Sequence, residues 1–250
     1  MAGGEGRERA LVTGASRGVG AAVVESLVAR GMEVWAMARP SAQLDALASR
    51  LGCHAVAVDM ADAGALDAAL ADLEVDVVVN NAGIITAVAP FAAIEPADID
   101  RMLDVNLRAT MVVTRALLPG MIARRRGHLF LVTSLLGPYA GPNVATYAAT
   151  KAALRAFGQC LRIELAGTDV RLTEVAPGRV RTDIYREAFG GDDARLQSTL
   201  FERYRALEPA HVAQALIAAL DMPPAADISI LELSPTDQAV GGLVFAPREE

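Results

Sequence analysis

Several apolar runs in this chain show no alternation with polar residues, and they constrain its fold more than any other feature. Residues 77–79 are three valines, and residues 128–132 read His-Leu-Phe-Leu-Val. Such runs are typical of strands that are covered on both faces, as in parallel sheets. Longer segments rich in alanine and leucine lie between them and predict helices. We expect strands over 10–13, 33–38, 54–58, 75–80, 127–134, 170–175 and 228–233, and helices over 18–30, 41–50, 63–73, 96–125, 145–165 and 208–219.

This regular exchange of strand and helix predicts an α/β fold. We expect one doubly wound Rossmann domain over residues 1–250, with a mostly parallel, seven-stranded sheet and helices on both faces. Residues 1–8 are charged and predict a flexible tail. The stretch 180–207 mixes glycine, charge and aromatic residues, and we expect it to form a lid over a substrate site.

Charge and composition exclude several classes of protein. The net charge of −7 and the pI near 5.1 argue against a nucleic-acid partner, because no basic stripe is available to displace phosphate counterions. Cys53 and Cys160 are far apart and the three histidines are scattered, so we expect neither a disulfide framework nor a metal site. The apolar stretch 75–94 is interrupted by polar residues and is too polar to cross a membrane. We expect a cytoplasmic protein without a membrane partner.

A glycine-rich turn follows the first expected strand. It reads Thr13-Gly14-Ala15-Ser16-Arg17-Gly18-Val19-Gly20 and leads directly into a helix. Glycines at this spacing allow a tight turn and a close approach of backbone to a pyrophosphate, which the free N–H groups of the helix then bind. A plain glycine-rich turn is the alternative. The position near the start of the chain favours a dinucleotide site.

The end of the second strand indicates which dinucleotide binds. NAD-binding Rossmann units carry an acidic residue there that holds the ribose hydroxyls. Here Arg39 occupies that place, and Arg17 lies in the turn nearby. Two guanidinium groups are suited to a 2′-phosphate, so we predict NADP(H). The alternative is that Arg39 is an ordinary surface residue.

Tyr147 and Lys151 are four residues apart in an expected helix, and therefore lie on one face of it. Lys151 is the chain's single lysine among 23 lysine and arginine residues. A site that must hold small hydroxyl groups and favour ionisation of a phenol has reason to use a compact ammonium. By itself, a Tyr/Lys pair at this spacing is equally compatible with a solvated helix face.

Taken together, these motifs resemble those of the short-chain dehydrogenase/reductase family, in its compact branch of NADPH-dependent ketoreductases. The resemblance covers nearly the whole chain. Besides the glycine-rich turn and the Tyr/Lys pair, it rests on Asn80-Asn81-Ala82-Gly83, Asn106, Ser134 and Pro177-Gly178-Arg179-Val180-Arg181-Thr182, in that order. Leu135 and Leu136 depart from the family, which often has smaller residues after the catalytic serine.

The resemblance implies roles for these residues. Tyr147 would be the general acid or base, with its pKa lowered by Lys151, and Ser134 would bind the substrate oxygen. Asn106 would hold a water beside the lysine. Residues expected to bind NADP(H) are Gly14, Ser16, Arg17, Gly18, Val19, Gly20, Arg39, Asp59, Asn80, Gly83, Tyr147, Lys151, Pro177, Gly178, Val180 and Thr182. Asn81 is expected to support the neighbouring strands instead.

The substrate is the least constrained part. The expected pocket residues are mostly apolar or aromatic: Ile85, Leu135, Leu136, Tyr139, Ile184, Tyr185 and Phe189. They favour a bulky, polyketide-like ketone of secondary metabolism, such as antibiotic biosynthesis. The tail 230–238 resembles that of relatives acting on small hydroxyacids or aldehydes, which is the alternative. A non-catalytic NADP(H) sensor is the alternative from another class. The resemblance also implies a homo-oligomer, a tetramer or dimer, formed through the helices over 96–125 and 145–165.

Overall fold

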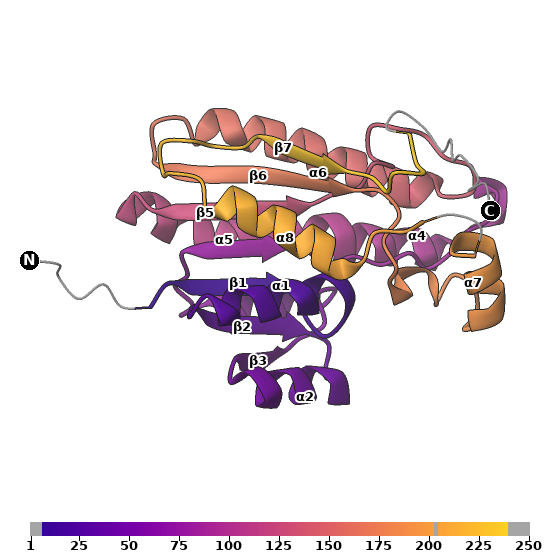
Figure 1. Ribbon diagram of the computed structural model, residues 1–250, viewed down its shortest axis with the longest axis horizontal. Coiled ribbons are helices and arrows are strands. Elements are labelled where there is room, and N and C mark those ends of the chain that lie inside the picture. The colour runs from indigo at the N-terminus through magenta and orange to yellow at the C-terminus, as the bar shows by residue number, and fades with distance from the viewer. Residues whose placement is uncertain (1–6, 203–204, 240–250) are drawn as a thin grey trace, which may run out of the picture.

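The strands of the computed structural model, which describes residues 7–202 and 205–239, form one sheet (Figure 1). All of its strand pairs are parallel, and the order is β3-β2-β1-β4-β5-β6-β7. The strands are β1 (Arg9–Thr13), β2 (Glu33–Ala38), β3 (His54–Ala57), β4 (Val77–Asn80), β5 (Gly127–Val132), β6 (Val170–Pro177) and β7 (Ile230–Leu233). The expected doubly wound fold is therefore confirmed, and the sheet is wholly rather than mostly parallel.

Helices cover both faces of this sheet. Their bounds are α1 (Gly18–Ala29), α2 (Ala42–Leu51), α3 (Ala63–Leu70), α4 (Pro96–Leu103), α5 (Ala109–Arg124), α6 (Ala145–Glu164), α7 (Asp193–Leu200) and α8 (Pro209–Leu220). One core packs α1, α2 and α8 against the strands, and a second core packs α3, α5 and α6 against the other face. Burial on both sides explains why β4 and β5 carry apolar side chains without alternation.

Two expectations about helices need correction. The helix expected over 96–125 is divided, because a π-helical turn, Asp104–Arg108, separates α4 from α5. The expected lid over 180–207 is more regular than its sequence indicated. It contains α7 and a short 3₁₀ turn, Asp183–Tyr185, while residues 203 and 204 lie outside the described residues. Most of the expected tail over 1–8 also lies outside them.

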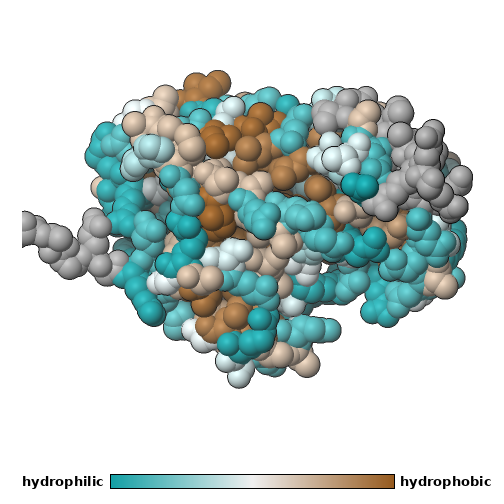
Figure 2. Space-filling model, viewed as in Figure 1, coloured by the Kyte–Doolittle hydropathy of each residue, from teal (hydrophilic) through white to brown (hydrophobic). Residues whose placement is uncertain are grey.

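The strand order reverses between β1 and β4, so the chain leaves these two strands toward opposite halves of the sheet. A crevice outside the carboxyl ends of the strands is the usual ligand site of such sheets. In Figure 1 the strand arrowheads point to one end of the molecule, where α4 and α7 also lie. Figure 2 shows apolar side chains gathered over β6 and β7 and a hollow between the sheet and α7.

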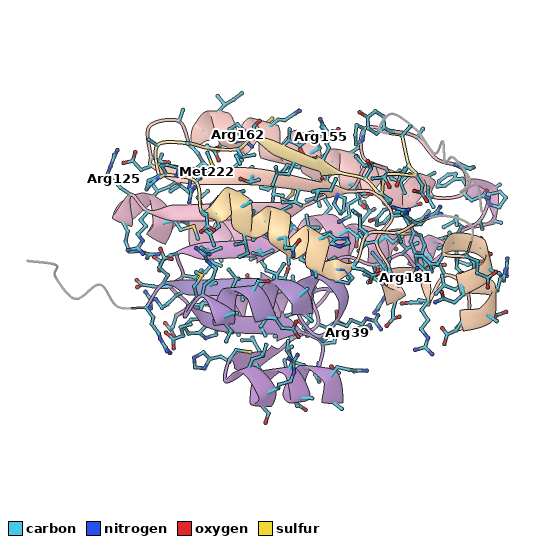
Figure 3. The ribbon with its side chains drawn as sticks, viewed as in Figure 1. Arg39, Arg125, Arg155, Arg162, Arg181 and Met222 are labelled. Atoms are coloured by element: carbon cyan, nitrogen blue, oxygen red, sulfur yellow. The ribbon has the colours of Figure 1, made fainter. Side chains whose placement is uncertain are left out.

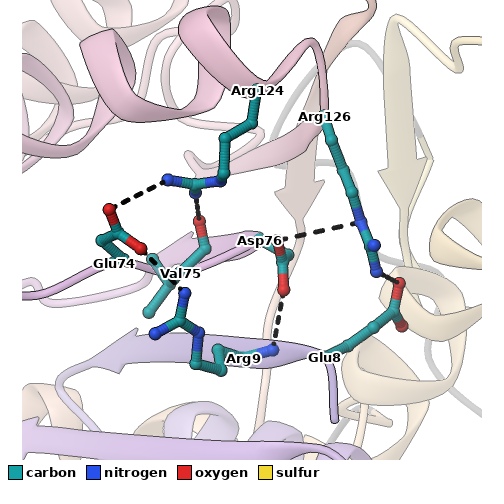
Figure 4. Close-up of polar contacts among 7 residues, drawn as sticks. All are labelled: Glu8, Arg9, Glu74, Val75, Asp76, Arg124 and Arg126. Carbon is teal, nitrogen blue, oxygen red and sulfur yellow. Dashed lines mark hydrogen bonds and ion pairs between the residues drawn. The ribbon is translucent and has the colours of Figure 1, made fainter. Parts of the chain in front are cut away.

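The basic run 124–126 lies at the opposite end of the sheet and is taken up by polar contacts (Figure 4). Arg124 donates to the Val75 carbonyl at 2.8 Å, and Arg126 pairs with Glu8 at 2.8 Å. Arg125 pairs with Asp169 at 2.7 Å. These contacts tie the end of α5 to the starts of neighbouring strands, so this basic run stabilises the fold.

No helix within the described residues combines the length and the apolar character that crossing a bilayer requires. In the same part of the chain, no three His, Cys, Asp or Glu side chains are grouped so that they could hold a metal ion.

Candidate active site

The glycine-rich turn between β1 and α1 has the shape that its sequence predicts. Gly14 and Gly18 have φ angles of +64° and +57°, a region that favours glycine. A Cβ on Gly20 would stand 2.2 Å from the Gly14 carbonyl oxygen, so a side chain there would displace the turn. Asn81 donates to the Thr13 and Gly14 carbonyls at 2.9 and 3.3 Å. This bracing confirms the expected support by Asn81 and leaves the N-terminus of α1 open to a ligand.

A cleft of about 400 Å³ opens beside this turn, at the hollow seen in Figure 2. Eight of the residues expected to bind the cofactor line it: Gly14, Ser16, Arg17, Val19, Arg39, Asp59, Gly83 and Thr182. The glycine-rich turn and the cleft, with Arg17 and Arg39 in its wall, form a site whose shape and hydrogen-bond donors fit NADP(H).

The far end of the cleft is positively charged. Arg39 is exposed at the carboxyl end of β2 (Figure 3), and its guanidinium has no hydrogen bond or ion pair to any described residue. Ser41 and Gln43 lie next to it at the start of α2 and also line the cleft. Arg17 is held only loosely, at 3.8 Å from Asp183 in the 3₁₀ turn after β6. A helix N-terminus beside two arginines is suited to a phosphate group.

Several lining residues were missed from the sequence. Ser41 and Gln43 had a usable signal, because they begin a helix next to Arg39. Arg101 and Val105 had none, since α4 and the π turn reach the cleft only through the fold. The full set of missed lining residues is Ala38, Pro40, Ser41, Gln43, Met60, Asn81, Ala82, Ile84, Arg101 and Val105.

Other expected cofactor residues do not line this cleft. The buried Asn80 amide donates to Thr114 of α5 at 3.2 Å. Gly18 and Gly20 shape the turn from inside it, and a Cβ on Gly18 would come within 3.2 Å of Thr182. The remaining expected cofactor residues that do not line the cleft are Tyr147, Lys151, Pro177, Gly178 and Val180.

Ser134, Tyr147 and Lys151 come together in the buried centre of the molecule. Ser134 follows β5, and its hydroxyl is hydrogen-bonded with Tyr147 on α6. The Lys151 ammonium lies 5.7 Å from the centre of the Tyr147 ring and donates to the Val132 carbonyl at 2.9 Å. It would stand 3.3 Å from a Cβ on Gly83, so the glycine there leaves room for the ammonium beside the cleft. The solvated-face alternative for Tyr147 and Lys151 is wrong, because they are 6% and 2% exposed.

Burial controls the ionisation of both groups. It raises the pKa of Tyr147 above its ordinary range, Tyr185 raises it further, and the hydrogen bond with Ser134 opposes the rise. Burial also lowers the pKa of Lys151 to about 8. The lowered Tyr147 pKa that the resemblance implied is therefore not produced by the chain alone, because desolvation of the phenolate outweighs the other influences.

Asn106 braces the site from the π turn. Its side-chain oxygen accepts from the Ile84 N–H at 2.8 Å, and its amide donates to the Ile84 carbonyl at 3.0 Å and to Thr150 at 3.2 Å. Thr150 immediately precedes Lys151 on α6. The Asn106 side chain therefore links the segment after β4 to α6, and it is fully engaged in that link.

The residues expected to form the substrate pocket are divided. Ile85, Leu136, Ile184 and Tyr185 gather around Tyr147 in one apolar cluster with Met102. Ile184 also reaches the cofactor cleft. Leu135 turns away, and its N–H donates to the Pro177 carbonyl at 3.1 Å. Phe189 lies under the Arg195 guanidinium at 5.4 Å, and Tyr139 is half-buried outside the cluster.

Comparison with known proteins agrees with this geometry. Residues 8–192 match the family model for short-chain dehydrogenases. The uncharacterised short-chain type dehydrogenase/reductase y4eK of Sinorhizobium fredii is 43% identical over 235 residues, 94% of each chain. The NADP-dependent 3-hydroxy acid dehydrogenase YdfG of Salmonella typhi is 36% identical, over 93% of this chain and 97% of its own. The closed form of serine dehydrogenase complexed with NADP+ superposes with a TM-score of 0.90 at 32% identity, covering 96% of this chain and 100% of that one.

A doubly wound sheet with a dinucleotide cleft and a buried Ser/Tyr/Lys group defines an oxidoreductase that uses NADP(H) and acts on CH–OH or C=O groups. The chain belongs to the short-chain dehydrogenase/reductase family. The alternative of a non-catalytic sensor is therefore set aside.

Proposed function

We propose that the enzyme interconverts small 3-hydroxy acids and their oxo acids with NADP(H). The observation that carries this proposal is the apolar cluster around Tyr147. Leu136 and Tyr185 pack there against a buried group that contains Ile85 and Tyr147. This close packing favours a small hydroxyacid over a bulky polyketide-like ketone. The bulky ketone stays a prediction.

Two further observations support an acid as substrate. By name, YdfG acts on 3-hydroxy acids, and the structural neighbour with a TM-score of 0.90 is a serine dehydrogenase. Arg179 follows β6 close enough to Tyr185 to oppose the rise of that phenol's pKa. Tyr185 in turn influences Tyr147. A cation placed this way would attract a carboxylate next to the reacting carbon.

The proposed chemistry follows from the placement of the side chains. Bound NADPH supplies the hydride. Tyr147 donates a proton to the carbonyl oxygen as the hydride reaches the carbon, so that a C=O group becomes CH–OH. Ser134 donates a hydrogen bond to the same oxygen and stabilises its growing negative charge. Lys151 places a positive charge near the phenol and favours the phenolate that proton transfer leaves behind.

A matched substrate panel tests this proposal. Turnover with NADP+ is measured on 3-hydroxypropionate, 3-hydroxybutyrate, serine and their methyl esters, and with NADPH on bulky aromatic ketones. We expect the free acids to have a kcat/KM about tenfold or more above their esters. Equal rates on acids and esters, or a preference for the bulky ketones, would refute the assignment. Tyr147→Phe is the control: turnover should vanish while NADPH still binds.

The expected homo-oligomer, cytoplasmic location, single domain and lid stay predictions. So do the residue roles taken from the family resemblance.

A further inference from the structure

Arg101 on α4 is a third arginine of the cleft, and its side chain makes no hydrogen bond or ion pair with the described residues. Its Nε is buried and has no hydrogen-bond partner among the described residues. The residue lines the cleft. Its neighbour in sequence, Asp104, pairs with Arg108 at 3.5 Å instead. A buried guanidinium nitrogen without a partner is unfavourable, unless a ligand supplies the missing acceptor.

The cleft that Arg101 lines also offers groups suited to a flat base. Val105 lies four residues further on, across the junction of α4 and the π turn, and also lines the cleft. Asp59 and Met60, after β3, line it as well. One oxygen of Asp59 accepts from the Ala61 N–H at 3.0 Å, and the other has no hydrogen bond to any described residue. The cleft therefore offers apolar contact, a carboxylate that accepts and a guanidinium that donates.

Adenine presents the matching groups. One edge of the base carries an amine donor next to a ring-nitrogen acceptor. A carboxylate can only accept, and a guanidinium can only donate, in addition to stacking on planar rings. The phosphate groups of the cofactor already have Arg17, Arg39 and the N-terminus of α1 at other points of the cleft wall.

We propose that Arg101 binds the adenine base of the cofactor, next to Asp59, which the family resemblance already assigns to cofactor binding. Arg101 then contributes affinity that does not depend on the 2′-phosphate. The inference rests on the cofactor cleft alone, so it stands or falls independently of the substrate proposed above.

Calorimetric binding tests the assignment without turnover. The variants are Arg101→Met, which keeps the length of the stem and removes the donors, and Arg39→Met. The ligands are NADPH, NADH and ADP-ribose, and the last two lack the 2′-phosphate. We expect Arg101→Met to weaken all three by about the same factor, roughly tenfold or about 1.4 kcal/mol. Arg39→Met should weaken NADPH alone.

Arg108→Met is the matched control, because Arg108 is an exposed arginine close by in the same helical segment and does not line the cleft. It should bind all three ligands like the wild type. If Arg101→Met also binds them like the wild type, the assignment is wrong. A loss confined to NADPH would equally overturn it, because Arg101 would then be a phosphate ligand. Arg101→Lys provides a second test if the methionine variant has a lowered Tm. It keeps the charge but lacks the planar guanidinium, so it too should bind all three ligands more weakly.

Discussion

Lys151 is the chain's single lysine, and its side chain is buried where a positive charge destabilises the folded state. The side chain is 2% exposed, and burial lowers its pKa to about 8. The Val132 carbonyl accepts one hydrogen bond from Nζ at 2.9 Å, which replaces only part of the hydration that the ammonium loses. The proposed catalytic role of Lys151 and the stability of the fold therefore place opposite demands on this position.

Replacing Lys151 by methionine should change how the free energy of unfolding depends on pH. Between about pH 8 and pH 10.5 the unfolded chain binds a proton at this lysine that the folded chain has released, so stability rises with pH in this window. Lys151→Met removes this dependence. We expect the variant to be the more stable protein near pH 7, with its advantage shrinking by about 2–3 kcal/mol toward pH 10.

Urea unfolding of both proteins across this pH range measures the difference. Lys151 is the only lysine and the two proteins differ at no other residue, so subtracting the two curves reports on Lys151 and on the groups that its charge influences. A constant difference between the curves would show that the pKa of Lys151 is not lowered by folding.

At the scale of single residues, the sequence identified the Ser134, Tyr147 and Lys151 group that the fold brings together, but not the pKa shifts within it. Spacing placed Tyr147 and Lys151 on one helix face, and motif order added Ser134. The raised pKa of Tyr147 arises from burial among Ile85, Met102 and other residues from distant segments. Only the folded chain brings those segments together, so no local pattern could reveal the direction of the pKa shift.

Among the elements, the π turn was hidden because no glycine or proline separates α4 from α5 in the sequence. A π turn changes the winding by one residue, and such turns are frequent at functional sites. Here it carries Asn106, whose side chain reaches Ile84 and Thr150. Helix α7 left a readable signal, because Asp192 is an N-cap residue whose side chain accepts from the Arg195 N–H at 2.9 Å.

The pairing of β5 with β6 buries an imidazole. His128 lies 3.9 Å from the Phe130 ring, its Nε2 is 2.8 Å from the Thr173 hydroxyl, and it is 2% exposed. Burial, together with the charges of Arg171 and Arg162, lowers its pKa to about 3. The folded protein therefore keeps this histidine neutral where the unfolded chain would protonate it.

This strand pair should make the enzyme sensitive to mild acid. Below about pH 6.5 the unfolded state binds a proton at His128 and the folded state does not, so stability falls as the pH falls. Between about pH 7 and pH 4.5 the loss from this residue is about 3 kcal/mol. His128→Leu should be less stable than the wild type near pH 7, because Thr173 loses its partner, but should lose less stability toward pH 4.5.

Urea unfolding at the two pH values provides the comparison. His54→Gln is the control, because His54 is an exposed histidine on β3 and its replacement should leave the acid-induced loss in place. If His128→Leu loses as much stability as the wild type, the acid sensitivity resides elsewhere.

For the whole molecule, the repeated exchange of strand and helix was enough to predict the sheet, because parallel strands require crossover helices. The glycine-rich turn and Arg39 placed the two ends of the cofactor site. The middle of the site could not be predicted in the same way, since Arg101, Val105 and Ile184 come from segments whose approach depends on how α4 and the lid pack. Substrate size depends on the same packing.

The cofactor cleft is lined by residues from several elements, and its occupation should therefore stabilise the whole fold. Its walls run from Gly14 after β1, through Arg39 and Asp59 after β2 and β3, to Thr182 after β6. A ligand at about 100 times its Kd adds about 2.7 kcal/mol to the free energy of unfolding. For a chain of 250 residues this corresponds to a rise in Tm of about 5–10 °C.

We expect NADPH to raise the Tm by this amount and NADH, at the same concentration, to raise it clearly less, because only NADPH has the 2′-phosphate that Arg39 can bind. Differential scanning fluorimetry over a range of ligand concentrations measures both shifts. In Arg39→Met the two shifts should become nearly equal, since the phosphate then lacks its guanidinium at the end of β2. Equal Tm shifts in the wild type would contradict the prediction that Arg39 binds the 2′-phosphate. The absence of any shift would contradict the assignment of the cleft as the cofactor site.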